Sequence, residues 1–204
     1  MNKTMKKLSF HNIKYSIDRE KIYKINDMDL EPGWVYLISG ESGSGKTTFI
    51  NVLLGFVPLI SGWIKIGDSN NQSENWLSYF SVQFQNHQIL NRNLVDNISM
   101  GGEINQKKLD YYIKKMKLES LNSEIVFGNR GEKISGGEKR RIAIARALYR
   151  SASVYIFDEP TNDLDQEMVS IVLKLIEEKK PGNIVIIASH DPRVMAISDS
   201  TIHF

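Results

Sequence analysis

The stretch at residues 40–48, G-E-S-G-S-G-K-T-T, constrains the fold of this chain more than any other part of the sequence. It fits the pattern G-x-x-x-x-G-K-[ST], whose glycines let several backbone N–H groups turn toward one anion. The apolar run 34–39 before it has strand character, and the apolar run 47–54 after it can continue as a helix. Strand, glycine loop and helix are the order that phosphate binding requires, because the helix N-terminus adds partial positive charge at the loop. The alternative is a chance match in a Gly/Ser turn.

The residue types in this loop predict what each would contact. Lys46 is expected to reach the terminal phosphates of a nucleotide, and the Thr47 hydroxyl is expected to hold Mg²⁺. The candidate nucleotide-binding residues of the loop are Gly40, Glu41, Ser42, Gly43, Ser44, Gly45, Lys46, Thr47 and Thr48.

Composition places the chain among ordinary soluble domains and excludes several kinds of chemistry. The 204 residues suit one domain, and 41% hydrophobic with 25% charged residues is typical of globular proteins. A net charge of +2 is too small to indicate a nucleic-acid partner. The absence of cysteine excludes disulfides, thiolate metal sites and thiol chemistry, and it fits a reducing compartment.

No stretch of the sequence predicts a membrane span. The basic start, residues 1–7, is not followed by the apolar segment of a signal peptide. The longest apolar region, residues 49–60, contains Asn51, Gly55 and Pro58 and is too short to cross a bilayer. Any membrane role is therefore expected to come through a partner.

Hydrophobic periodicity and turn residues predict the order of the elements. We expect strands at 8–17, 21–30, 34–39, 63–66, 79–85, 154–157, 184–188 and 201–204, and helices at 106–118, 135–150 and 166–179. The runs 154–157 and 184–188 are uninterrupted and apolar, as in a parallel sheet covered on both faces. Residues 86–131 differ in character and predict an inserted helical lobe.

A pair of carboxylates follows the predicted strand 154–157. Asp158 and Glu159 stand where an α/β sheet places its ligands, at the carboxyl end of a strand. Asp158 is expected to bind Mg²⁺ through water, and Glu159 to polarise an attacking water. The alternative is that Asp158-Glu159-Pro160 is only a strand-ending turn.

A second helix start suited to anions lies at residues 134–138, I-S-G-G-E. Ser135 is a good N-cap, and the two glycines after it leave backbone N–H groups open to a ligand. One nucleotide does not need two such helix ends, but two copies of the chain facing each other would use both. The basic run 139–141 that follows is expected to be a solvated face.

These motifs, in this order, resemble the nucleotide-binding subunit of an ABC transporter along the whole chain. Residues 134–138 are similar to the family's LSGGQ signature, 40–48 to its Walker A loop and 154–158 to its Walker B strand. Residues 162–165, N-D-L-D, resemble its D-loop. Ile134 and Glu138 replace the usual Leu and Gln, and Asp163 stands where Ala is commoner, which would alter communication across a dimer.

The resemblance also gives roles to single residues. Tyr15 is similar to the aromatic residue that stacks on adenine, Gln85 to the Q-loop glutamine and His190 to the switch histidine. Judged without the family, Tyr15 is also explained as a packed strand residue and His190 as a structural one. The resemblance implies a catalytic set of Glu159, His190, Gln85 and Lys46, a magnesium set of Thr47, Gln85 and Asp158, and further nucleotide contacts from Ser135, Gly136, Gly137 and Glu138.

The fold implied is that of an ABC ATPase. It is an α/β fold whose P-loop core has a mostly parallel sheet, with an N-terminal antiparallel β subdomain and an inserted α-helical subdomain. We expect one domain over residues 1–204, with the core and β subdomain at 1–85 and 146–204 and the lobe with the signature at 86–145.

The function implied is ATP hydrolysis, with Mg²⁺, that powers a transporter. The copies would form a homodimer, or a heterodimer with a second ATP-binding domain, closing head to tail on ATP. The partner would be a transmembrane permease, separate or fused, which would hold this chain at the cytoplasmic face of the membrane. Residues 96–101 and 129–132 resemble exporter-type members.

Two other functions stay open. A soluble ABC-type ATPase acting on ribosomes or nucleic acid is one, because residues 160–165 resemble the translation-factor branch. Those proteins carry two such domains, and repair ATPases carry a long coiled coil that no heptad pattern predicts here. A non-hydrolysing binding module is the other, and the presence of Glu159 and His190 argues against it.

Overall fold

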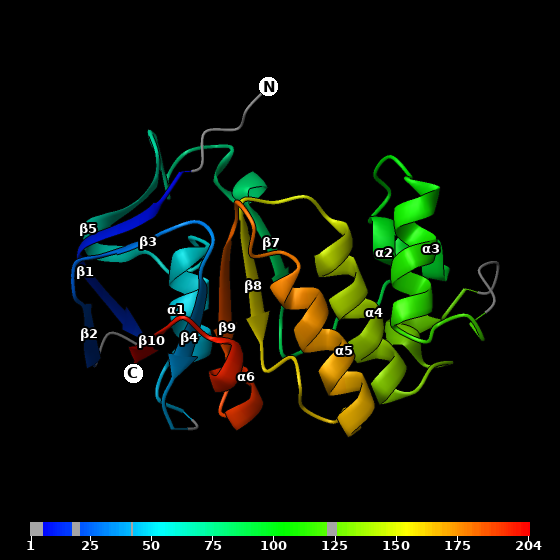
Figure 1. The fold of residues 1–204 in the computed structure, drawn as a ribbon. Coiled ribbons are helices and arrows are strands. Elements are labelled where there is room, and N and C mark those ends of the chain that lie inside the picture. The colour runs from blue at the N-terminus through cyan, green and yellow to red at the C-terminus, as the bar shows by residue number, and fades with distance from the viewer. Residues whose placement is uncertain (1–5, 18–20, 42, 122–125) are drawn as a thin grey trace. The chain divides into compact units, whose positions relative to one another are not determined.

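The computed structural model describes residues 6–17, 21–41, 43–121 and 126–204, and the chain forms two compact units (Figure 1). The first unit contains residues 1–80, 152–156 and 179–204. The second unit contains residues 81–151 and 157–178. Among the residues described, none of the helices has the length and apolar character that crossing a membrane requires.

An antiparallel sheet forms one part of the first unit. Its order is β2-β1-β5-β6, and β3 also pairs with β1. The predicted strand 21–30 is divided in two, since the Asn12 N–H bonds to the Asp27 carboxylate at 2.6 Å instead of joining the ladder. The strands are β1 (Leu8–Ile17), β2 (Lys21–Ile25), β3 (Met28–Leu30), β5 (Leu59–Ile66) and β6 (Ser69–Asn70).

The second sheet has the order β10-β4-β9-β8-β7. Both neighbours of β4 run parallel to it, with Leu37 opposite Ile187 of β9 and Thr201 of β10. Strands β4, β8 and β9 are almost wholly buried, as their unbroken apolar runs predict. The strands are β4 (Val35–Ser39), β7 (Phe80–Gln83), β8 (Val154–Asp158), β9 (Ile184–Ala188) and β10 (Ser200–His203).

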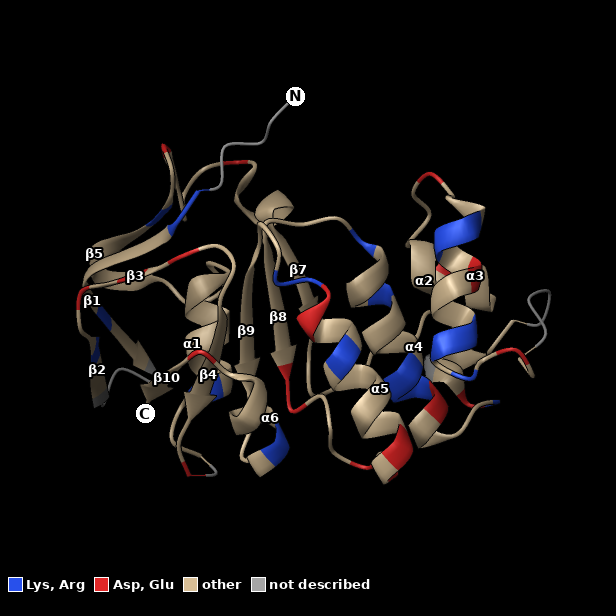
Figure 2. Ribbon diagram, in the orientation of Figure 1, with Lys and Arg blue, Asp and Glu red and all other residues tan. Residues whose placement is uncertain are grey.

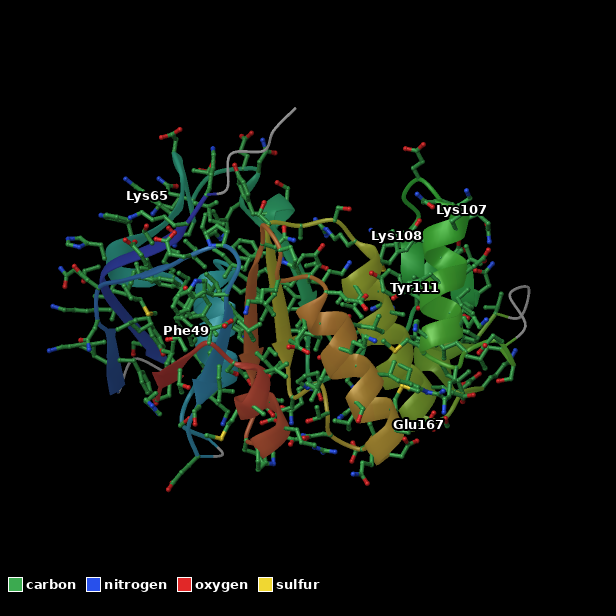
Figure 3. The ribbon with its side chains drawn as sticks, viewed as in Figure 1. Phe49, Lys65, Lys107, Lys108, Tyr111 and Glu167 are labelled. Atoms are coloured by element: carbon green, nitrogen blue, oxygen red, sulfur yellow. The ribbon has the colours of Figure 1, made fainter. Side chains whose placement is uncertain are left out.

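The core of the first unit forms around α1 (Lys46–Leu53). Phe49, labelled in Figure 3, is fully buried, and its ring lies 5.7 Å from that of Phe10 on β1 and 5.0 Å from that of Phe204 after β10. The helix therefore packs against elements of both sheets. A short 3₁₀ helix (Trp76–Tyr79) and α6 (Pro192–Ile197) complete this unit.

The second unit is mainly helical and forms around α4 (Gly136–Tyr149). The other helices are α2 (Leu94–Ser99), α3 (Gln106–Lys115) and α5 (Gln166–Glu177). Figure 2 shows basic residues along both α3 and α4. The apolar face of α4 is nevertheless buried, as the periodicity predicts. Its buried residues include Ile142, Ile144, Ala145 and Leu148.

The structure confirms the mixed α/β class with one mostly parallel and one antiparallel sheet. The predicted helices 106–118, 135–150 and 166–179 correspond to α3, α4 and α5. The pattern gave no boundaries for α2 or α6, because six residues are too few to show a helical period.

Asn97 holds the loop that precedes α2. Its side chain is fully buried, and its Nδ2 lies within hydrogen-bond distance of the carbonyl oxygens of Leu90, Arg92 and Asn93 (3.0–3.2 Å). Its Oδ1 accepts from the Leu90 N–H at 2.8 Å and from the Arg146 guanidinium at 3.1 Å. One amide thus satisfies backbone groups that would otherwise be buried without partners.

We expect Asn97→Ala to lower the free energy of unfolding by about 2–4 kcal/mol, because several buried polar groups lose their partner together. Asn93→Ala is the control, since it removes only the N-cap bond to the Asp96 N–H (2.8 Å) and should cost about 1 kcal/mol. Chemical denaturation of the two variants tests this. Equal losses would show that Asn97 does not organise the loop.

Candidate functional site

The phosphate loop connects β4 to α1 within the first unit. Gly43 and Gly45 have φ of +81° and +106°, a region that side-chain-bearing residues rarely adopt, and Gly45 is the N-cap of α1. The Ser44 N–H donates to the Glu41 carbonyl at 3.1 Å, which tightens the turn. Gly40, Glu41, Thr47 and Thr48 occupy the loop and the first turn of α1, and Ser42 lies outside the described residues.

Two polar side chains of the loop are suited to an anion. The Lys46 ammonium donates to the carbonyls of Gly40 (2.8 Å) and Glu41 (3.0 Å), so it lies folded over the loop. The Ser44 hydroxyl is buried and has no hydrogen-bond partner among the residues described. A phosphate oxygen would satisfy this hydroxyl and the N–H groups at the start of α1.

His190 lies at the same edge of the sheet as the phosphate loop. It directly follows β9, and Ala188 near the end of β9 is in register with Ile38 near the end of β4. The His190 side chain is exposed, and the next residue, Asp191, caps α6 by accepting the Arg193 N–H at 2.9 Å. Parallel pairing thus brings two predicted site elements of the first unit together.

The structure argues against Tyr15 as a base-stacking residue. Its side chain is fully buried, its ring stacks on that of Tyr23 at 5.2 Å, and burial raises the pKa of its hydroxyl to about 12. Tyr23 on β2 is only half-buried, and a methyl group placed on Gly45 would lie 3.8 Å from its ring. Tyr23 is therefore an aromatic residue beside the phosphate loop, and the sequence analysis did not single it out.

The carboxylate pair lies in the second unit. Asp158 is the last residue of β8 and is 1% exposed, while Glu159 is 7% exposed and has φ of +50°. A non-glycine residue in this region costs of order 1–2 kcal/mol, and such strain is concentrated at functional sites. A polar residue that the sequence did not single out, Gln83, donates its amide to the Asp158 carbonyl at 3.2 Å and to the Phe84 carbonyl at 2.7 Å.

The signature stretch forms the N-terminus of α4 with a full capping box. The Ser135 N–H and hydroxyl both donate to the Glu138 carboxylate, at 2.7 and 2.6 Å, and the Glu138 N–H donates back to the hydroxyl at 3.3 Å. These bonds lower the pKa of Glu138. Ser135 and Gly136 are exposed, and Gly137 is half-buried, so the helix end is open to a ligand.

The predicted Q-loop and D-loop also lie in the second unit. Gln85 has an exposed side chain in the loop after β7. Asp163 is exposed with φ of +54°, and Asp165 caps α5 by accepting the Met168 N–H at 2.8 Å. The prediction that residues 139–141 form a solvated face is wrong at Arg140, which is 7% exposed because it points into these loops.

The proposed magnesium ligands offer only oxygen donors: the Thr47 hydroxyl, the Gln85 amide oxygen and the Asp158 carboxylate. This is the donor chemistry that Mg²⁺ takes. Among the described residues there is no group of three or more acidic or histidine side chains that would hold a metal by itself. The residues thus fit an ion held largely by nucleotide phosphates and water, and they do not form a complete protein cage.

Comparison with known proteins shows the family. A family model described as "ABC transporter" matches residues 23–162, which is more than half of the chain. A second model, described as "AAA domain, putative AbiEii toxin, Type IV TA system", matches the smaller range 130–196. The chain belongs to the ABC transporter family.

Three curated relatives illustrate the match. The chain is 33% identical over 90% of its length to the alpha-hemolysin translocation ATP-binding protein HlyB of Escherichia coli O6:H1. It is 31% identical over 96% of its length to a multidrug resistance ABC transporter ATP-binding and permease protein of Lactococcus lactis. It is 30% identical over 93% of its length to the ATP-dependent lipid A-core flippase of Francisella tularensis.

The chain spans only 28–35% of the length of these relatives. A solved bacterial Atm1-family ABC exporter with ATP bound covers 98% of the chain with a TM-score of 0.89 at 24% identity, and the chain covers 37% of that protein. The family resemblance and the fold predicted from the sequence are therefore confirmed.

His87 lies two residues after the predicted Q-loop glutamine, and its contacts indicate which protonation state its imidazole takes. Its Nδ1 lies 3.1 Å from the Phe84 carbonyl, and its Nε2 accepts from the Arg140 Nε at 2.9 Å. Burial and the nearby Arg140 charge lower the pKa of His87, and the Arg146 charge acts in the same direction, while Phe84 and Asp163 oppose them. The neutral imidazole with its proton on Nδ1 satisfies both contacts.

We expect His87 to make the protein less stable as the pH falls below about 6.5, the ordinary pKa of histidine. In that range the unfolded chain binds a proton that the folded chain rejects, so unfolding is favoured, whereas above it the contribution to stability is fully present. The measurement is the melting temperature of wild type and His87→Gln between pH 7.5 and 5.5. As the pH is lowered, the melting temperature of His87→Gln should fall less than that of wild type. Parallel falls in the two proteins would contradict the neutral state assigned to His87.

Proposed function

We propose that this chain binds ATP with Mg²⁺ and hydrolyses it, and that this cycle powers an ABC transporter of the exporter type. The observation that supports ATP binding is the conformation of the loop at residues 40–48. It has left-handed glycines, a folded-over Lys46 and an unsatisfied Ser44 hydroxyl, all at the N-terminus of α1. These features favour a polyphosphate over any other common ligand class.

In the proposed complex the loop N–H groups and Lys46 hold the β- and γ-phosphates. Thr47 and Asp158 would hold Mg²⁺, with Gln85 as a further ligand, and the ion would supply charge neutralisation to the phosphates. Tyr23 takes the place proposed from sequence for Tyr15 and offers its ring to the adenine. The ring edge already lies over Gly45, where the loop turns into α1.

Hydrolysis is assigned to groups that position and polarise one water. Glu159 is the proposed general base, and its burial removes the carboxylate from bulk water. His190 is proposed to contact the γ-phosphate from the edge that it shares with the phosphate loop. Positioning and electrostatic stabilisation are expected to supply most of the rate, as in other phosphoryl transfers.

We infer that two such domains close head to tail, as a homodimer or with a second ATP-binding domain. The start of α4 supports this, since Ser135–Glu138 form a second exposed helix N-terminus that one nucleotide on one chain leaves unused. ATP would lie between this helix end of one copy and residues 40–48 of the other. The proposed organisation is one domain, with residues 86–145 as its helical lobe.

The membrane partner is proposed from the relatives. Their names describe translocation, multidrug resistance and lipid flipping, and the structural neighbour is an exporter. A transmembrane permease, separate or fused, would then place this domain at the cytoplasmic face of the membrane. The second unit exposes apolar side chains suited to such a contact: Phe84, Met100, Ile104 and Val126. Nucleic acid is not an expected partner.

We expect Glu159→Gln to retain ATP binding, to lower kcat by about 100-fold or more, and to accumulate the ATP-bound dimer, because the base is lost while the binding groups stay. Steady-state hydrolysis and size-exclusion chromatography with ATP test this. Lys46→Ala is the control that should lose ATP binding itself. Wild-type turnover in Glu159→Gln would refute the role of Glu159.

A tagged form of the native protein, purified from solubilised membranes of its host, should carry membrane-spanning segments, either as a co-purifying permease or within its own polypeptide. Mass spectrometry identifies which. Recovery with ribosomal proteins or nucleic acid and without any membrane protein would contradict the transporter proposal and favour a soluble ABC ATPase.

A further inference from the structure

We propose that Arg140 is a positioning residue for ATP hydrolysis, which holds the Glu159 backbone and the Gln85 loop in their catalytic arrangement. This inference rests on the function proposed above, because it concerns the same reaction. Arg140 lies in the second turn of α4, the helix that begins at the signature, and the sequence had suggested only a solvated residue there.

All three nitrogens of the Arg140 guanidinium face the loops that carry the proposed chemistry. Nε donates to His87 Nε2 at 2.9 Å, in the loop that contains Gln85. Nη1 donates to the carbonyl of Asn162 and lies 3.5 Å from that of Glu159. Nη2 pairs with the Asp163 carboxylate at 3.2 Å.

The Arg140 contacts coincide with the strained part of the backbone. Glu159 and Asp163 both have left-handed φ, +50° and +54°, and Arg140 reaches the carbonyl oxygen of one and the side chain of the other. Residues hold such conformations only where their surroundings over-determine them. A planar guanidinium holds several oxygens in one fixed geometry with five donors, whereas a lysine ammonium has three donors on a flexible stem.

The two loops are tied together at two points. Gln83 bonds to the carbonyls of Phe84 and Asp158, and His87 returns to the same Phe84 carbonyl while it accepts from Arg140. Gln83 therefore sets the start of both loops, and Arg140 sets where they continue toward Gln85 and Glu159. Loss of Arg140 removes the contacts that hold the backbone from Glu159 to Asp163, and these contacts set the direction of the Glu159 carboxylate.

A positioning role predicts an effect on catalysis that exceeds the effect on binding. The Arg140 bonds given above end on His87, Glu159, Asn162 and Asp163, so we expect Arg140→Gln to keep the Kd for ATP and the KM within about threefold and to lower kcat by about 10- to 100-fold. Arg140→Lys should restore little of the rate, because charge without the fork does not hold the carbonyls. Full rescue by lysine, or an unchanged kcat in the glutamine variant, would overturn the proposal.

Arg141→Gln is the matched control on the same helix. Its guanidinium also bonds to backbone carbonyls, through Nη1 to those of Met116 and Lys117 at 2.9 and 2.8 Å after α3, and through Nε to that of Gly137 at 3.4 Å on its own helix. None of these three carbonyls lies in the two loops. We expect a fall in melting temperature like that of Arg140→Gln with kcat within about twofold of wild type. Equal losses of kcat in both variants would show that Arg140 acts only through stability.

Asp163→Asn keeps the test open if Arg140→Gln does not fold. The side chain is 83% exposed and asparagine tolerates the left-handed φ of +54°, so loss of the charge should leave the melting temperature unchanged while kcat falls by about two- to fivefold. An unchanged kcat would count against the proposal.

The double variant Arg140→Gln/Glu159→Gln distinguishes a failure of the positioning role of Arg140 from a failure of the proposed ATPase function. In that background Arg140→Gln should change the residual rate by less than about twofold, because a residue that acts through Glu159 has nothing left to position. A further 10-fold loss would overturn the positioning role. If wild type does not hydrolyse ATP, or if Glu159→Gln turns over normally, the function itself fails.

Discussion

Parallel pairing of β4 with β9 determines where the first unit presents its chemistry. The pairing sets Ile38 opposite Ala188, so the phosphate loop after one strand and His190 after the other must leave the sheet at the same edge. Almost every residue of both strands is buried, so a displaced pairing that left backbone groups without partners would cost the desolvation of those groups. The loop can then be polar and glycine-rich, since the strands and α1 hold its ends.

In the second unit, the loops are held in place by hydrogen bonds from buried side chains to backbone carbonyls, whereas in the first unit the sheet edge holds them. Gln83, Arg140 and Asn97 are all buried, and each fastens the loop of another segment. Buried donors of this kind are costly when they lose their partners, so the bonds that they make to these carbonyls favour one arrangement over near alternatives. This suits the role proposed for the loop at Glu159, which is to direct the carboxylate of that residue.

Sequence was sufficient where the determinants are local. The Ser135 cap, the loop glycines and the buried strands follow from residue type and spacing, and the structure has them within one or two residues of the predicted positions. The family resemblance did not reveal that Tyr15 is buried, and the charge pattern did not reveal that Arg140 is buried. Burial depends on which strands and loops come together across long separations in the sequence. Charge suggested that Arg140 is solvated, whereas its environment of carbonyl oxygens and Asp163 is created by tertiary contacts alone.

Glu138 shows how a small departure from the family pattern alters the second helix end. Its carboxylate accepts both the N–H and the hydroxyl of Ser135, so a negative charge already sits on the N-terminal pole of α4. A phosphate that approaches this pole competes with that carboxylate for the Ser135 hydroxyl and is repelled by its charge. The capping box therefore stabilises the free helix end, and in the proposed ATP-bound dimer Ser135 would have to leave Glu138 before its hydroxyl could donate to a phosphate.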